Sequence, residues 1–208
     1  MIAGVLLVGA SGLAREVLAA GMTGVTGILD DDRSLLGTTV GGVPVVGPVD
    51  AAVHRDERLL VCIGPSAARR RVVRRLSEAG VAEHRFATYA APSARVGATS
   101  VVGAGTILLD GVVVTADAVI GRHVVVMPNC VITHDDVIDD GATLAAGVAL
   151  GGGVRVGEGA YLGMNASIRQ GVAVGADATV GMGAVVLTDV PAAETWAGVP
   201  ARPLGVLA

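Results

Sequence analysis

The sequence predicts a small α/β domain followed by an all-β parallel β-helix. The prediction rests on three observations: strand-like and helix-like segments alternate in the first part, the second part repeats every six residues, and aromatic side chains are scarce. Hydrophobic residues make up 52% of the 208 residues, but aromatic residues only 2%. A core of this composition is built from Val, Leu, Ile and Ala instead of aromatic rings.

The strands of the first domain, predicted for residues 1–88, are visible as short apolar runs. "GVLLVGA" at 4–10 and "RLLVCIG" at 58–64 are continuous and typical of buried parallel strands. "VTGILDDD" at 25–32 reads as a third strand that ends in acids. The unit is about half the size of a dinucleotide-binding fold and is Rossmann-like.

Two helices are expected between these strands and after them. "SGLAREVLAAG" at 11–21 has Ser11 near its start and a glycine at its end. "SAARRRVVRRLSEAG" at 66–80 shows an apolar face of Ala68, Val72 and Leu76 and ends at a glycine. The remaining helical face is predicted to be solvated and carries the arginines Arg69, Arg70, Arg71, Arg74 and Arg75.

The second domain, predicted for residues 89–190, is defined by a six-residue repeat. Branched aliphatic residues occupy sixteen consecutive repeat positions: Val96, Val102, Leu108, Val114, Ile120, Val126, Ile132, Ile138, Leu144, Leu150, Val156, Leu162, Ile168, Val174, Val180 and Val186. Small residues mostly follow four positions later, where little side-chain room is expected. Such repeats mark a β-helix in which each aliphatic side chain points inward and stacks on the next coil. Residues 191–208 form a C-terminal tail.

Charge and cysteine content limit the functional classes. The net charge of −4 argues against nucleic acid as the main partner. Cys62 and Cys130 lie far apart without metal-ligand spacing, which fits a reduced intracellular compartment and predicts no metal site. The apolar N-terminus lacks a basic region before it, and the uncharged run at 141–154 is too short and glycine-rich for a membrane span. We therefore expect a cytoplasmic protein without a membrane partner.

The repeat motifs carry a family resemblance. "VGAGT", "IGRHV", "LGGGV", "VGEGAYLGMNASI" and the closing "WAGVPARPL" resemble the hexapeptide-repeat acyltransferases. The resemblance implies a left-handed helix, three hexads in each triangular coil and a homotrimer. Left-handed coiling would be an exception to the usual right-handed connection of parallel strands.

The first domain resembles one subgroup of that family. "VGASGLAREV", "GILDDD", "GVPVVGPVD" and "VCIGPSAARRRVV" are similar to enzymes that acetylate nucleotide-linked amino sugars, and sialic acids. This implies acetyl-CoA as co-substrate and such a sugar as acceptor. The implied substrate-binding positions are Ser11, Gly12, Leu13, Asp30, Asp31 and Gly64. Relatives often carry a histidine where Leu13 stands.

The chemistry of these residues also indicates ligand binding, independently of the resemblance. "GASG" between a strand and a helix presents backbone N–H groups and the positive helix end, which suit a phosphate or a sugar carrier. It also fits a simple tight turn. Asp30 and Asp31 follow the second strand, where acids bind ribose in dinucleotide sites, and a solvated loop is the alternative.

The stretch "VITHDD" at 131–136 interrupts the repeat with a histidine and two acids. Since Ile132 points inward, His134 is predicted to lie on the turn, facing solvent or a neighbouring chain. The resemblance implies that His134 is the catalytic base at a subunit interface and that Asp135 orients its ring. A neutral imidazole can take the proton of an attacking amine or hydroxyl, and a carboxylate on its other nitrogen fixes the tautomer.

Gly152 follows His134 by eighteen residues and is predicted to lie one coil away, about 4.8 Å along the axis. A residue without a side chain leaves room there for a thioester, and a backbone N–H of Gly151–Gly153 can serve the oxyanion. The resemblance implies coenzyme A contacts at Thr143, Gly152, Met164 and Met182. Thr143 stands where relatives often have a second histidine. His123 has no neighbouring acid and is expected to be structural.

Other functions are alternatives to this one. A sialic acid or other sugar O-acetyltransferase fits the same residues. A zinc carbonic anhydrase of this helix type needs three histidines, whereas the repeats contain only His123 and His134. A non-catalytic nucleotide-binding scaffold does not require the His134–Asp135 pair, and an NAD enzyme would need the third glycine of the dinucleotide motif.

Overall fold

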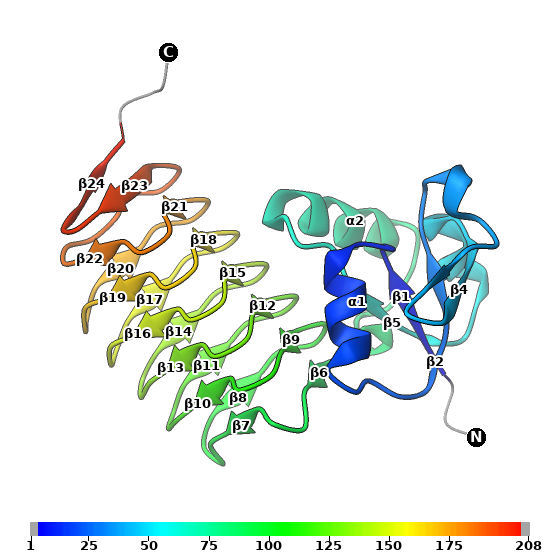
Figure 1. Ribbon diagram of the computed structural model, residues 1–208, viewed down its shortest axis with the longest axis horizontal. Helices are drawn as coiled ribbons and strands as arrows, with labels where there is room; N and C mark the ends of the chain where they lie inside the picture. The colour runs from blue at the N-terminus through cyan, green and yellow to red at the C-terminus, as the bar shows by residue number, and fades with distance from the viewer. Residues whose placement is uncertain (1–3, 205–208) are drawn as a thin grey trace.

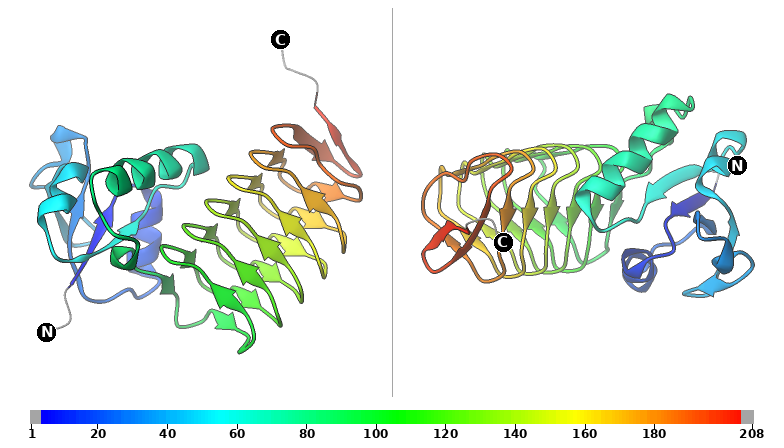
Figure 2. Two further views of the ribbon diagram at one scale, coloured as in Figure 1. Left: turned by 180° about the vertical axis from the view of Figure 1, so that it is seen from behind. Right: turned by 90° about the horizontal axis from the view of Figure 1, so that it is seen from above.

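The computed structural model describes residues 4–204. Residues 1–3 and 205–208, which belong to the predicted first domain and C-terminal tail, lie outside the described residues. An α/β unit flanks the first coils of a β-helix, and the last described strands lie at the opposite end (Figure 1). Figure 2 shows the coils stacked in succession beside this unit.

The α/β unit is built around one five-stranded sheet of order β3-β4-β2-β1-β5. The parallel strands are β1 (Val5–Val8), β2 (Val25–Leu29), β4 (Val43–Gly47) and β5 (Arg58–Val61), and β3 (Thr39–Val40) pairs antiparallel with β4. The three strands predicted from apolar runs are confirmed. Strands β3 and β4 were not predicted, because a proline and two glycines interrupt the apolar pattern of this short hairpin.

Two α-helices, both predicted from the sequence, cover opposite faces of this sheet. Helix α1 (Gly12–Ala19) buries Leu13, Ala14 and Val17 on one face. Helix α2 (Ser66–Glu78) packs Leu76 and Val72 on the other. Short 3-10 helices complete the unit: η1 (Arg33–Leu35), η2 (Val49–His54) and η3 (Glu83–Arg85).

The β-helix has three sheets of two-residue strands. The β13 sheet contains β7 (Arg95–Val96), β10 (Val113–Val114), β13 (Val131–Ile132), β16 (Ala149–Leu150), β19 (Ser167–Ile168) and β22 (Val185–Val186). The β14 sheet contains β8 (Val101–Val102), β11 (Val119–Ile120), β14 (Val137–Ile138), β17 (Arg155–Val156) and β20 (Ala173–Val174). The β15 sheet contains β6 (Tyr89–Ala90), β9 (Ile107–Leu108), β12 (Val125–Val126), β15 (Thr143–Leu144), β18 (Tyr161–Leu162) and β21 (Thr179–Val180), and ends in β23 (Thr195–Gly198) and β24 (Ala201–Pro203).

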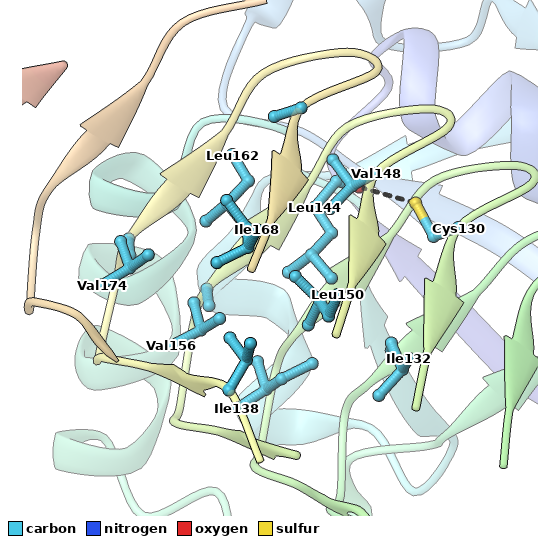
Figure 3. Packing of buried hydrophobic residues seen from close by; sticks show 14 of the residues in the cluster. Cys130, Ile132, Ile138, Leu144, Val148, Leu150, Val156, Leu162, Ile168 and Val174 are labelled. Atoms are coloured by element: carbon cyan, nitrogen blue, oxygen red, sulfur yellow. Dashed lines mark hydrogen bonds between the residues drawn. The ribbon is translucent and has the colours of Figure 1, made fainter. Parts of the chain in front are cut away.

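The coils up to β22 span eighteen residues, as shown by Val113 pairing with Val131 and Val125 with Thr143. The last coil spans sixteen, because Thr179 pairs with Thr195. The second residue of each strand is the aliphatic residue of the sequence repeat, and from Leu108 to Val186 these side chains are buried in one core cluster (Figure 3). Val96 lies in the first coil of the β-helix and is 37% exposed, because no further coil covers it. The predicted left-handed parallel β-helix is confirmed.

Arg69 joins the two parts of the chain. Its guanidinium is fully buried and donates through Nε to the His123 carbonyl at 2.8 Å and through Nη2 to the Gly141 carbonyl at 2.8 Å. Nη1 donates to the carbonyls of Ile63 and Gly64 on the α/β side. The prediction that Arg69 lies on a solvated helix face is wrong, because the carbonyls of the β-helix turns replace water as its hydrogen-bond acceptors.

Two further arginines of α2 form ion pairs. Arg70 pairs with Glu158 and Asp177 on successive coils, and Arg75 pairs with Asp31 and Asp50 within the α/β unit. The solvated-face prediction therefore fits Arg71 and Arg74, which are exposed. Within residues 4–204, no helix combines the length and hydrophobicity required to cross a bilayer.

Candidate active site

His134 stands on the turn between β13 and β14. Its side chain is 66% exposed, and its Nδ1 lies 2.7 Å from Oδ2 of Asp135. Asp135 has a φ of +62°, a left-handed conformation that Asp tolerates and that brings its carboxylate beside the preceding ring. The hydrogen bond with Asp135 raises the pKa of His134 and commits Nδ1 to that contact, so that Nε2 is the nitrogen available to a substrate.

Gly152 lies over the imidazole, as the eighteen-residue spacing predicted. A Cβ placed on Gly152 would approach His134 Nε2 to 2.5 Å, so the ring occupies the space that a side chain would need. The neighbouring N–H groups are engaged: Gly151 donates to Ile168 and Gly153 donates to the His134 carbonyl. Among the described residues, Gly152 N–H has no acceptor within hydrogen-bonding distance.

Asp136 completes this turn, and its burial was not predicted from the sequence. The side chain is fully buried, with Oδ2 accepting from Thr133 N at 2.7 Å and Oδ1 from Val154 N at 2.8 Å. Burial raises the pKa of Asp136 to about 6. An acid in a row otherwise filled by small or aliphatic residues, such as Ala118 one coil earlier, was the signal that could have found it.

The predicted coenzyme A positions do not all gather around His134 within one chain. Met164 and Met182 are 46% and 68% exposed and lie on successive turns between the β15 and β13 sheets, at the other edge of the β13 sheet. Thr143 is 5% exposed and faces the α/β unit. Its hydroxyl accepts from Arg69 Nη2 at 2.8 Å and lies 2.9 Å from Ser66 Oγ.

The predicted sugar-binding residues of the first turn are closely connected. Ser11 caps α1 by accepting from Leu13 N at 3.2 Å, and its hydroxyl donates to the Cys62 carbonyl at 2.7 Å. Asp30 accepts from Ala10 N at 2.7 Å through Oδ2. Gly12 is exposed at the start of the helix. The structure thus brings the turn after β1 and the acid after β2 together at the carboxyl edge of the sheet.

The other predicted sugar-binding residues have structural contacts of their own. Leu13 is buried in the core, 6% exposed. Asp31 accepts from Val49 N at 3.0 Å and pairs with Arg75, whose hydrogen bond holds the pKa of Asp31 below its usual value. The carbonyl of Gly64 accepts from Arg69 Nη1 at 2.6 Å.

His123 is packed inside the junction. Its ring meets Phe86 edge-to-face with centroids 4.7 Å apart, and burial lowers its pKa to about 4. It lines a cavity of about 290 Å³ between α2 and the coil turns, which His134 does not line. A neutral, packed ring matches the structural role expected for this residue.

Comparison with known proteins places the chain in a family. The model for the bacterial transferase hexapeptide (six repeats) matches residues 153–188. A search of curated proteins returned no match. Perosamine N-acetyltransferase from Caulobacter crescentus, solved in complex with CoA and GDP-perosamine, is 34% identical over 99% of this chain and 99% of its own, with a TM-score of 0.88. The chain belongs to the hexapeptide-repeat acyltransferases.

Further relatives of this acyltransferase share both parts of its fold. The acetyltransferase domain of PglB from Neisseria gonorrhoeae FA1090, solved with acetyl coenzyme A, is 30% identical over 97% of this chain and 98% of its own, with a TM-score of 0.86. WeeI from Acinetobacter baumannii AYE is 25% identical over 97% of this chain and 99% of its own, with a TM-score of 0.68. The family, the fold and the acyltransferase activity predicted from the sequence are confirmed.

Proposed function

We propose that this acyltransferase moves an acetyl group from acetyl-CoA to the amino group of a nucleotide-linked amino sugar, with His134 as general base at a subunit interface. The observation that carries the proposal is the exposed His134–Asp135 pair, 2.7 Å between Nδ1 and Oδ2, with Nε2 beside Gly152. The relatives support the substrates, because the Caulobacter enzyme was solved with CoA and GDP-perosamine and the Neisseria domain with acetyl coenzyme A.

His134 supplies the proton transfer. The neutral amine attacks the thioester carbonyl while Nε2 takes its proton, and Asp135 stabilises the imidazolium that forms. When the tetrahedral intermediate collapses, the carbon–sulfur bond breaks and the imidazolium returns the proton to the leaving thiolate. The products are the acetamide and free coenzyme A, and the base is regenerated.

Gly152 supplies the oxyanion donor in this proposal. Its N–H is the one of the Gly151–Gly153 turn that makes no hydrogen bond within residues 4–204, and it lies next to the ring that removes the proton. In acyl transfer, a backbone N–H that donates to the forming oxyanion typically contributes much of the reduction in activation free energy. The imidazole occupies the space that the missing side chain leaves, which keeps the ring close to this backbone segment.

The sugar nucleotide is assigned to the carboxyl edge of the α/β sheet. Gly12 begins α1, and the N-terminus of a helix favours phosphate oxygens. Asp30 holds the preceding turn through Ala10 N, while Ser11, Leu13, Asp31 and Gly64 shape the same edge. With Ser11 and Leu13 committed to internal contacts, Gly12 and the backbone of the turn carry the direct contact to the phosphate.

A homotrimer accounts for the separation of the coenzyme A residues. Val101, Val119 and Val131, at 60%, 47% and 37% exposure, form an apolar surface on the two sheets that flank the His134 turn. A second copy covering this surface would bring its Met164 and Met182 edge toward His134, so that coenzyme A lies between protomers. The buried free cysteines suit a reducing compartment, and we assign the enzyme to the cytoplasm.

A thiol-release assay tests the proposal, with acetyl-CoA offered to UDP-, GDP- and dTDP-linked amino sugars and to sialic acid. His134→Ala should lower the rate on the preferred amino sugar by at least about a hundredfold. Sedimentation should show the same oligomer. His84→Ala, at an exposed histidine of η3, is the matched control and should leave the rate unchanged. An unchanged rate in His134→Ala removes His134 from the mechanism, and release with sialic acid alone would replace the proposed acceptor.

A further inference from the structure

Asp136 is the second acid of the His134 turn, and the proposed proton transfer gives it no role. It occupies the D-row, defined here as Ser100, Ala118, Asp136, Val154 and Val172, the positions just before the strands of the β14 sheet. Residues at these positions face the crowded interior of the turn. A fully buried carboxylate there must find donors, because an unpaired one is costly.

The donors that Asp136 finds belong to two different turns. Thr133 N, at the start of the His134 turn, donates to Oδ2 at 2.7 Å. Val154 N, at the end of the Gly151–Gly153 turn one coil later, donates to Oδ1 at 2.8 Å. Thr133 Oγ1 adds a second link between the coils by donating to the Leu150 carbonyl at 3.1 Å. The two turns that carry the proposed base and oxyanion donor are therefore joined through one side chain.

We propose that Asp136 is a positioning residue for acetyl transfer: its carboxylate holds the His134 turn and the Gly152 turn at fixed spacing and keeps a negative charge beneath the imidazole. This inference rests on the proposed function. Each oxygen accepts a backbone N–H, so an amide cannot reproduce the pair of bonds without turning its NH2 group toward a backbone donor.

The charge has a second effect, on the basicity of His134. The charged groups that act on His134 are Asp135, Asp136 and Asp117, and each raises its pKa. Asp117 lies on the preceding coil, eighteen residues before Asp135. In return, a protonated His134 favours the ionised form of Asp136. Removing the Asp136 charge must therefore lower the pH at which His134 gains its proton.

The experiment follows His134 by NMR titration of its imidazole and measures acetyl transfer on the same samples. Two variants are compared with the native chain: Asp136→Asn, which keeps the shape, and Asp136→Ala, which introduces the residue found in the same row at Ala118 and is therefore expected to fold. We expect the His134 midpoint to fall to lower pH, because a nearby negative charge is lost. We expect kcat to fall at least about tenfold while KM for acetyl-CoA stays constant.

Ser100→Ala is the matched control. Ser100 occupies the same row two coils earlier and also joins coils, with its Oγ accepting from Ala118 N at 3.1 Å. It should change neither the midpoint nor kcat. Native values of both quantities in Asp136→Ala overturn the positioning role even if His134 proves essential. Failure of the native enzyme to acetylate any amino sugar would instead contradict the proposed function, and the midpoint would still decide the role of Asp136.

Discussion

The imidazole of His134 fills the space in which a side chain at Gly152 would lie, although the two residues are eighteen positions apart in the sequence. The contact follows directly from the coil length, since residues eighteen apart occupy equivalent positions on successive turns. The repeat therefore places His134 beside Gly152, and the local sequence "THDD" provides the histidine and its acidic neighbour.

Gly152→Ala should reduce activity by moving the ring. The added methyl group would overlap the imidazole, and because the side chain is exposed the ring can swing outward at little cost in stability. We expect kcat to fall at least about tenfold, with a change in thermal midpoint of no more than a few degrees. Gly47→Ala, where a methyl group meets only ordinary contacts at 3.6 Å, is the control. Full activity in Gly152→Ala would contradict the proposed placement of the substrates.

Asp135→Asn should change the pH dependence of the reaction. Asp135 raises the pKa of His134, so its ionised form delays the appearance of the neutral base as pH rises. With asparagine, the acid limb of the kcat/KM profile should move to lower pH, and the plateau should fall at least about tenfold because the imidazolium loses its partner. Asparagine tolerates the φ of +62° at this position. Asp139→Asn, at an exposed acid of the next turn, should leave the profile unchanged.

Asp30→Ala should weaken binding of the sugar nucleotide without affecting binding of coenzyme A. The carboxylate fixes the turn before α1 through Ala10 N and stabilises its own loop through Asp32 N at 2.9 Å. Its loss should raise KM for the sugar nucleotide about tenfold, equivalent to about 1.4 kcal/mol. Calorimetric titration with coenzyme A should give the native affinity. Asp50→Ala, which removes an acid bonded to Arg75 instead, is the control, and equal KM values in both variants would argue against a specific role for Asp30.

Arg69→Ala should destabilise the junction between the α/β unit and the β-helix. The buried guanidinium, whose pKa burial lowers to about 10, stays charged at neutral pH and satisfies carbonyls of both parts. Leaving these acceptors unpaired should lower the free energy of unfolding by about 3 kcal/mol or more. Arg71→Ala, at an exposed position of the same helix, should change it by less than about 0.5 kcal/mol. Thermal unfolding of both variants at one protein concentration provides the comparison.

The β-helix could be predicted from the sequence because its rule is local and repeated. Inward aliphatic residues recur every six positions, so Ile132 and its counterparts could be assigned before any contact was known. The contact of His134 with Gly152 followed from the same register, whereas its pairing with Asp135 was implied by the family resemblance. The proposed catalytic roles remain predictions that the experiments above test.

The features that escaped prediction depend on partners distant in the sequence. Arg69 has the helical spacing of a solvated residue, and only the docking of α2 on the turns near His123 and Gly141 buries it. The same docking turns Thr143 toward Ser66. Asp136 was overlooked because charge in "HDD" suggests a solvated turn, whereas its position in the repeat places the side chain inside.

The eighteen-residue register also determines which changes in chain length this enzyme can accommodate. Inserting a single residue within a strand would turn its aliphatic side chain toward water. The turns accommodate a change in length, because the last coil is two residues shorter and Thr179 still pairs with Thr195. Adding or deleting a whole coil beyond Val186 would preserve every inward side chain and lengthen or shorten the prism by about 4.8 Å. The β-helix can therefore gain or lose complete coils at this end while the histidine turn stays unaltered.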